Sequence, residues 1–175
     1  MFVNEFTRVP DSFFVSYWDL GGSDNIDSDR TTNWLLHKTP GQMYTFVEST
    51  GFRLRKSERN RRIYNTEKNY RDKYGEMGQI FSRVEWQMGS AVEVTAEIIR
   101  ECGEFAMRDD HVTRKLTERA EPLQVQMQSG NVRFLKQACT PEILDEFMSF
   151  DQGKHDDYIS AAAGAYNCAA VIRML

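Results

Sequence analysis

The chain has 175 residues, of which 41% are hydrophobic and 27% are charged, and this composition is typical of a folded protein rather than a disordered one. The length predicts one domain, and we expect residues 1–175 to form it. No apolar stretch approaches the ~20 residues that a membrane-spanning helix requires, and the N-terminus lacks the pattern of a secretion signal. The 3 cysteines are far apart, which predicts reduced thiols rather than a disulfide framework or a zinc site.

The formal net charge of −4 conceals one basic segment. Residues 53–73 contain nine Lys and Arg against three Asp and Glu. A basic segment in an otherwise acidic chain is typical of an element that faces phosphate. A solvated helix face explains the same pattern, so both interpretations stay open at this point.

Three strands are predicted in the first third of the chain. Residues 13–22 (FFVSYWDLGG) are aromatic and rich in β-formers, and they end in glycines. Residues 31–39 and 43–50 flank the turn signal Pro40-Gly41, which predicts two antiparallel strands. A helix is expected next, with Ser57 as its N-cap and Gly75 as its end.

The rest of the chain alternates helices and strands. We expect strands at residues 79–87 and 131–135, and helices at 91–105, at 113–130 with an interruption near Pro122, at 141–150 after a Thr140 cap, and finally from about residue 153. This order predicts a mixed α/β architecture with helices on both faces of the sheet.

Carboxylates stand at the ends of several predicted elements. Asp19 follows Tyr17-Trp18 at the end of the first strand, and Glu85 lies near the end of a later strand. Asp156 and Asp157 open the last helix. Strand ends gather at one edge of an α/β sheet, and carboxylates collected there repel one another unless a cation neutralises them. Mg²⁺ and Mn²⁺ prefer such oxygen ligands, and two of these ions can clamp a phosphodiester.

The last helix has a run of small residues directly after its acidic start. Residues 160–164 (SAAAG) would let this helix lie close against the sheet, bringing its first turn near Asp19 and Glu85. Successive helical residues point about 100° apart, so Asp156 and Asp157 cannot face one ion equally. Taken alone, residues 155–157 also fit a simple N-cap, and Asp19 also fits a turn-capping carboxylate. Only their combination favours a metal site.

Five stretches together resemble the nuclease domain of the large terminase subunit of tailed bacteriophages. The resemblance covers about residues 15–167, and its motifs follow in the family's order as SYWDLGGSDNIDSDRTTNWLL, RRIYNTEKNYRDKYG, VEWQMGSA, KLTERAEPLQVQMQSGNVRFL and FMSFDQGKHDDYISAAAGAYN.

The resemblance implies an RNase H-like three-layer α/β fold, with a mixed central β-sheet and helices on both faces. It also implies a metal-dependent endonuclease that uses two Mg²⁺ or Mn²⁺ ions to cleave double-stranded viral DNA concatemers during genome packaging, in the cytoplasm of the infected bacterial host. The expected partners are DNA, the terminase ATPase motor domain, the portal and the small terminase subunit. No Gly-x-x-x-x-Gly-Lys-Ser/Thr phosphate loop occurs in the chain, so we expect no ATPase activity.

Individual residues are carried over by motif match. The resemblance makes Asp19, Glu85, Asp156 and Asp157 the candidate catalytic residues and metal ligands. Its near-site residues are His155 and Asp29. The candidates for DNA binding are Lys115 and Arg119 by motif match, and Arg55, Arg59 and Arg62 from the basic segment.

Two other functions also fit these residues. One is another RNase H-like nuclease, such as a junction resolvase, which would share the carboxylates but prefer branched DNA. The other is a non-catalytic DNA-docking module of the packaging machinery.

Overall fold

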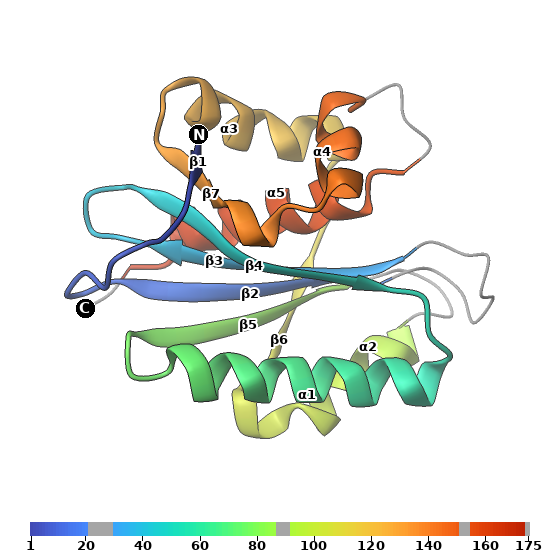
Figure 1. The fold of residues 1–175 in the computed structure, drawn as a ribbon. Helices are drawn as coiled ribbons and strands as arrows, with labels where there is room; N and C mark the ends of the chain where they lie inside the picture. The colour runs from blue at the N-terminus through green and yellow to red at the C-terminus, as the bar shows by residue number, and fades with distance from the viewer. Residues whose placement is uncertain (21–29, 87–91, 151–154, 174–175) are drawn as a thin grey trace.

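The computed structural model describes residues 1–20, 30–86, 92–150 and 155–173 of the chain, which form three layers (Figure 1). The helices and strands, in chain order, are β1 (Phe2–Val3), β2 (Phe13–Asp19), β3 (Thr31–Lys38), β4 (Tyr44–Phe52), α1 (Lys56–Tyr74), β5 (Gln79–Trp86), α2 (Val92–Glu101), β6 (Arg108–His111), α3 (Leu116–Gln128), β7 (Val132–Leu135), α4 (Pro141–Met148) and α5 (Asp157–Val171). Helices α3, α4 and α5 cover one face of the sheet, and α1 and α2 cover the other. The predicted architecture is confirmed.

The central sheet is mixed and has seven strands in the order β1-β7-β4-β3-β2-β5-β6. β2 pairs with β3 in the antiparallel sense and with β5 in the parallel sense. β5 in turn pairs with β6 in the parallel sense. The carboxyl ends of β2, β5 and β6 therefore meet at one edge of the sheet, where Asp19 and Glu85 lie.

Most predicted elements are present, and three details differ. α1 begins at Lys56 rather than after a Ser57 cap, because Arg55 already has the extended backbone of an N-cap residue (φ −63°, ψ 157°). α3 continues through Pro122, which removes only one backbone hydrogen bond while the helix packs on α5. Strands β1 and β6 were not predicted, since two and four residues carry too little periodicity to recognise.

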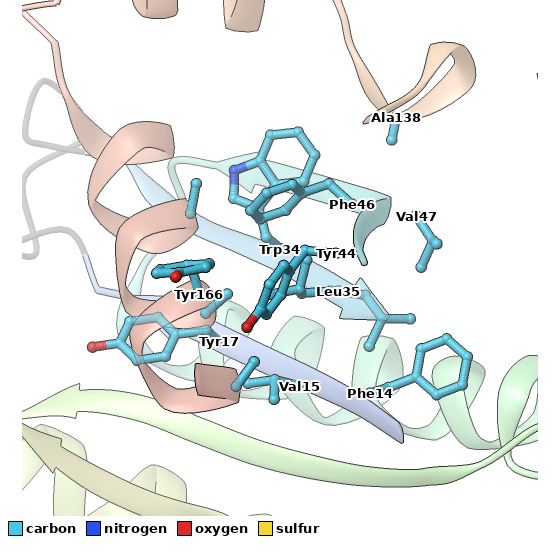
Figure 2. Close-up of a cluster of buried hydrophobic side chains, with 14 of the residues drawn as sticks. Phe14, Val15, Tyr17, Trp34, Leu35, Tyr44, Phe46, Val47, Ala138 and Tyr166 are labelled. Atoms are coloured by element: carbon cyan, nitrogen blue, oxygen red, sulfur yellow. The ribbon is translucent and has the colours of Figure 1, made fainter. Parts of the chain in front are cut away.

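The largest hydrophobic cluster among the described residues includes the core between the sheet and α5. Figure 2 shows Val15 and Tyr17 of β2 with Trp34 of β3 and Tyr166 of α5 in this core. The run of small residues in α5, residues 160–164, is buried along its whole length. A Cβ atom on Gly164 would lie 2.2 Å from the Tyr17 ring, so the close approach requires glycine here. The prediction that small residues let this helix lie against the sheet is confirmed.

A buried carboxylate holds β2 and β5 together on the opposite face. Glu67 of α1 has no exposed surface. Its Oε1 accepts hydrogen bonds from Ser16 Oγ (2.5 Å) and Trp18 Nε1 (2.7 Å), and its Oε2 accepts from Ser82 Oγ (2.5 Å) and Arg71 Nη1 (2.5 Å). Since buried charges require such partners, this network fixes α1 against both strands that carry the candidate carboxylates.

Among the described residues, no helix combines the length and the hydrophobicity that crossing a bilayer requires.

The first prediction concerns a buried histidine. His37 packs between the rings of Phe14 and Phe6, with ring centroids 4.7 and 5.0 Å away, and burial lowers its pKa to about 4. The unfolded chain binds this proton near pH 6.5, so His37 destabilises the fold as the pH falls from 6.5 towards 4. We expect the free energy of unfolding to fall by about 1–2 kcal/mol more between pH 7 and pH 5 in the wild type than in His37→Phe. Urea denaturation of both proteins at both pH values measures this difference, and equal losses would contradict it.

The second prediction concerns the contact between α5 and β2. Gly164→Ala places a methyl group against the Tyr17 ring, so we expect it to lower the free energy of unfolding by about 1–3 kcal/mol. Gly103→Ala is the matched control, because a Cβ there meets no atom within 4 Å. Urea denaturation measures both changes, and an equal effect of the two substitutions would refute the proposed close contact.

Candidate functional site

Three carboxylates from distant parts of the chain converge at one edge of the sheet. Asp19 is the last residue of β2, Glu85 lies near the end of β5, and Asp157 is the first residue of α5. Asp19 interacts electrostatically with both Glu85 and Asp157. The sheet and the last helix thus bring together side chains that are 66 and 72 positions apart in the sequence.

The pKa of Asp19 is raised well above its ordinary value. Burial is the largest cause, because it disfavours the charged carboxylate, and repulsion by Glu85 and Asp157 adds to it. A hydrogen bond from Ser160 and the positive charge of Arg119 act in the opposite direction. The site therefore carries more negative charge than its protein surroundings neutralise.

Arg119 of α3 faces the carboxylates. Its Nη1 donates to Glu85 Oε2 at 2.9 Å and its Nη2 donates to Ser160 Oγ at 2.9 Å. Both members of the Arg119–Glu85 ion pair are nearly enclosed, with side chains 11% and 14% exposed. The residue expected to contact DNA phosphate is instead bonded to a candidate metal ligand in this structure.

Tyr17 and Asp110 belong to the same cluster, and neither was predicted as a site residue from the sequence. The Tyr17 hydroxyl donates to Asp110 Oδ2 at 2.8 Å and also contacts Glu85 Oε2 at 3.5 Å. Asp110 lies opposite Glu85 in the pairing of β5 with β6. Burial and both carboxylates raise the pKa of Tyr17, so its hydroxyl stays protonated as a donor. The string Asp109-Asp110-His111 is a signal that could have identified this carboxylate, but β6 itself was not predicted.

The two aspartates at the start of α5 have different surroundings. Asp157 is 7% exposed, and its Oδ2 accepts from the backbone N–H of Arg30 at 3.4 Å. Asp156 is exposed at the N-cap position, and its side chain caps no backbone N–H. The cap comes instead from Glu146 of α4, which accepts from Tyr158 N–H (2.7 Å) and Ile159 N–H (3.0 Å). Asp157 rather than Asp156 therefore belongs to the cluster with Asp19 and Glu85.

The other residues expected at the site lie around it. His155 is exposed and lines a hollow with Arg30 and Glu142, while Asp29 lies outside the described residues. Lys115 is exposed one helical turn before Arg119.

The basic segment lies across the sheet from the carboxylates. Arg55 and Arg62 are exposed, whereas Arg59 is 4% exposed, so its side chain is not offered to phosphate. Figure 1 shows the start of α1 and the start of α5 at the same end of the sheet, on opposite faces. DNA that contacted the starts of both helices would have to cross this edge of the sheet.

The donor chemistry of the cluster fits a hard divalent cation. Asp19, Glu85 and Asp157 supply several carboxylate oxygens beside the Arg119 guanidinium, and Mg²⁺ and Mn²⁺ prefer oxygen ligands of this kind. In the arrangement found, the described parts of the chain contain no group of three His, Cys, Asp or Glu side chains placed to hold one ion. The carboxylates therefore converge without closing around a common point.

Solved structures with the same fold come from nucleic-acid enzymes. No protein-family model and no curated protein matches the chain. The human cytomegalovirus terminase nuclease domain superposes with a TM-score of 0.70 at 12% identity, over 92% of this chain and 86% of that one. Its Mn-soaked, inhibitor-bound form gives 0.66 at 12% identity, over 90% and 82%. T. thermophilus RuvC in complex with a Holliday junction substrate gives a TM-score of 0.50 at 13% identity, over 91% of this chain and 96% of that one. The chain has the RNase H-like fold that the resemblance implied.

Proposed function

We propose that the protein is a metal-dependent endonuclease that cleaves double-stranded DNA. The observation that carries this proposal is the convergence of Asp19, Glu85 and Asp157 from three elements at one sheet edge. The Mn-soaked form of the cytomegalovirus terminase nuclease domain supports it, because a similar fold there was exposed to the same kind of ion.

We assign the ligand roles to Asp19, Glu85 and Asp157, with Asp156 as an outer carboxylate that reaches a second ion or its waters. Divalent ions held by these residues would polarise the phosphodiester and lower the pKa of the attacking water. Ser160 hydrogen-bonds Asp19 and also contacts Glu85 Oε2 at 3.4 Å, and thus fixes the spacing between two ligands. Tyr17 keeps Glu85 and Asp110 in position through its hydroxyl group.

Basic residues on both sides of this edge are the proposed DNA contacts. Lys115 at the N-cap of α3 and the exposed Arg55 and Arg62 of the basic segment are available to phosphate. Phosphate contacts position DNA without reading its sequence. We therefore expect little sequence specificity and a steep loss of binding with added salt.

The finer assignment is cleavage of viral DNA concatemers during genome packaging. The larger TM-scores to the terminase nuclease domain, 0.70 and 0.66 against 0.50 for RuvC, favour this over a junction resolvase. On this assignment the ATPase motor, the portal and the small terminase subunit are the proposed partners.

A junction resolvase is the second candidate, because the superposition covers 96% of the RuvC chain, which was solved on a Holliday junction. Cleavage of linear duplex and of a four-way junction of the same sequence separates the two functions. Preference for the junction would replace the packaging assignment while leaving the metal site in place.

The cleavage prediction compares the two adjacent aspartates. With Mn²⁺ we expect the wild type to nick and linearise plasmid, and to be less active with Mg²⁺, which dehydrates reluctantly. Asp157→Ala should lower the rate at least ~100-fold because it removes a direct ligand, whereas Asp156→Ala should lower it by about 10-fold or less. Gel assays of supercoiled plasmid measure these rates. Intact plasmid at high protein and Mn²⁺ concentration would favour the non-catalytic docking module instead.

A stability prediction follows from the raised pKa of Asp19. A carboxyl group with a raised pKa in the fold stabilises it only at low pH, and that contribution is lost as the pH rises through the folded-state pKa. At neutral pH, Asp19→Asn should therefore raise the melting temperature of the metal-free protein by a few degrees while abolishing its stabilisation by Mn²⁺. Asp72→Asn, at an exposed carboxylate of α1, should change neither quantity. Calorimetry with EDTA and with Mn²⁺ makes the comparison, and a lower melting temperature of metal-free Asp19→Asn would refute the electrostatic argument.

A further inference from the structure

Arg119 is bound into the carboxylate cluster by more than one contact. Its guanidinium bridges Glu85 Oε2 and Ser160 Oγ, both at 2.9 Å, and its charge also acts on Asp19. The backbone carbonyl of Arg119 accepts from Asn167 Nδ2 of α5 at 3.0 Å, which fixes this point of α3 against the last helix. The side chain therefore occupies a defined position among the proposed metal ligands.

The guanidinium of Arg119 lies against the same carboxylates that a bound cation would neutralise. The Arg119 guanidinium donates to Glu85 Oε2, and the hydroxyl oxygens of Tyr17 and Ser160 lie 3.5 and 3.4 Å from the same oxygen. A divalent ion of the Mg²⁺ type needs a carboxylate oxygen at about 2.0–2.1 Å. An ion that uses this oxygen would compete for it with the Arg119 guanidinium, which already donates to it at 2.9 Å.

We propose that Arg119 is the internal counter-cation of the metal-free site, and that a divalent ion displaces its guanidinium from Glu85 on binding. This inference rests on the proposed metal site and adds a positioning role for a residue that motif matching assigned to DNA. The positive charge of Arg119 offsets part of the repulsion between Glu85 and Asp19 in this arrangement.

The contacts of Arg119 are incomplete, which makes such an exchange feasible. Its Nε is buried and has no hydrogen-bond partner within the parts of the chain that the structure describes. A buried donor without a partner is costly, so this arrangement leaves one donor of the Arg119 side chain unsatisfied. The preceding turn of α3 is open to solvent, since Lys115, Thr117 and Glu118 are all exposed. The Arg119 side chain, which is itself 11% exposed, lies next to this open turn.

Manganese affinity tests the inference without relying on cleavage. Arg119→Gln removes the competing charge but keeps a polar side chain of similar length, so we expect it to bind Mn²⁺ at least ~10-fold more tightly than the wild type. Lys115→Gln removes the same charge one turn earlier on α3, and we expect its affinity to stay within about twofold. Electron paramagnetic resonance of free Mn²⁺ in titrations of the full chain measures all three affinities.

Arg119→Lys separates displacement from simple repulsion. Lysine keeps the charge but cannot bridge Glu85 and Ser160 with one planar group, so its Mn²⁺ affinity should fall between those of the wild type and Arg119→Gln. The Nε–H signal of Arg119 can be assigned in ¹⁵N–¹H spectra as the arginine side-chain signal that Arg119→Lys lacks. In the wild type this Nε–H should be protected from exchange with solvent in the absence of Mg²⁺. It should exchange rapidly once Mg²⁺ is added.

The outcomes distinguish this inference from the proposed function. Tighter binding by Arg119→Gln, together with loss of Nε–H protection on adding Mg²⁺, supports displacement. Equal or weaker binding by Arg119→Gln beside measurable binding by the wild type overturns the inference and leaves the metal site intact. Absence of Mn²⁺ binding by both proteins overturns the inference together with the metal site on which the proposed function rests.

Discussion

The contact between Gly164 of α5 and the ring of Tyr17 in β2 determines where the last helix lies. Because glycine has no Cβ, the helix axis can approach the sheet until the Tyr17 ring meets its backbone, at a position where a methyl group would overlap by more than an ångström. The first turn of α5 is fixed at the same time by hydrogen bonds from Thr32 Oγ1 to the Asp157 carbonyl (2.8 Å) and from Trp34 Nε1 to the Tyr158 carbonyl (2.9 Å). Asp157 thereby reaches the carboxylates of the sheet.

Buried negative charge is compensated differently on the two faces of β2 and β5. Under α1, Glu67 is fully buried, but each of its oxygens has two donors, including the guanidinium of Arg71. Under α5, Asp19 and Glu85 face a third carboxylate with Arg119 as a shared counter-charge. A satisfied buried charge stabilises the position of its strands, whereas an excess of charge at a sheet edge is a feature of sites that bind cations. The face under α1, where the buried Glu67 is fully hydrogen-bonded, thus holds in place the strands whose other face carries Asp19 and Glu85.

A residue of α4 caps the N-terminus of α5, so the acidic residues at the start of α5 are not needed as caps. Glu146 of α4 accepts the N–H groups of Tyr158 and Ile159, which would otherwise attract a local carboxylate. Asp156 then remains exposed to solvent, and Asp157 turns towards β2 and β3. The helix dipole still favours negative charge at this end, so the arrangement lowers the cost of gathering carboxylates before a cation arrives.

The sequence by itself determined the order and type of most elements, because alternating and helical periodicities, the Pro40-Gly41 turn and the Thr140-Pro141 helix start are local signals. It also identified Asp19, Glu85 and the adjacent pair Asp156 and Asp157 as candidates, since charges at the ends of aromatic strands and at the start of a helix stand out along the chain. Only the tertiary structure decided that Asp157 rather than Asp156 faces the site, that Glu146 caps α5, and that Asp110 and Arg119 join the cluster. Each of these depends on the distance between elements far apart in the chain, and that distance is set by packing, which no local pattern encodes.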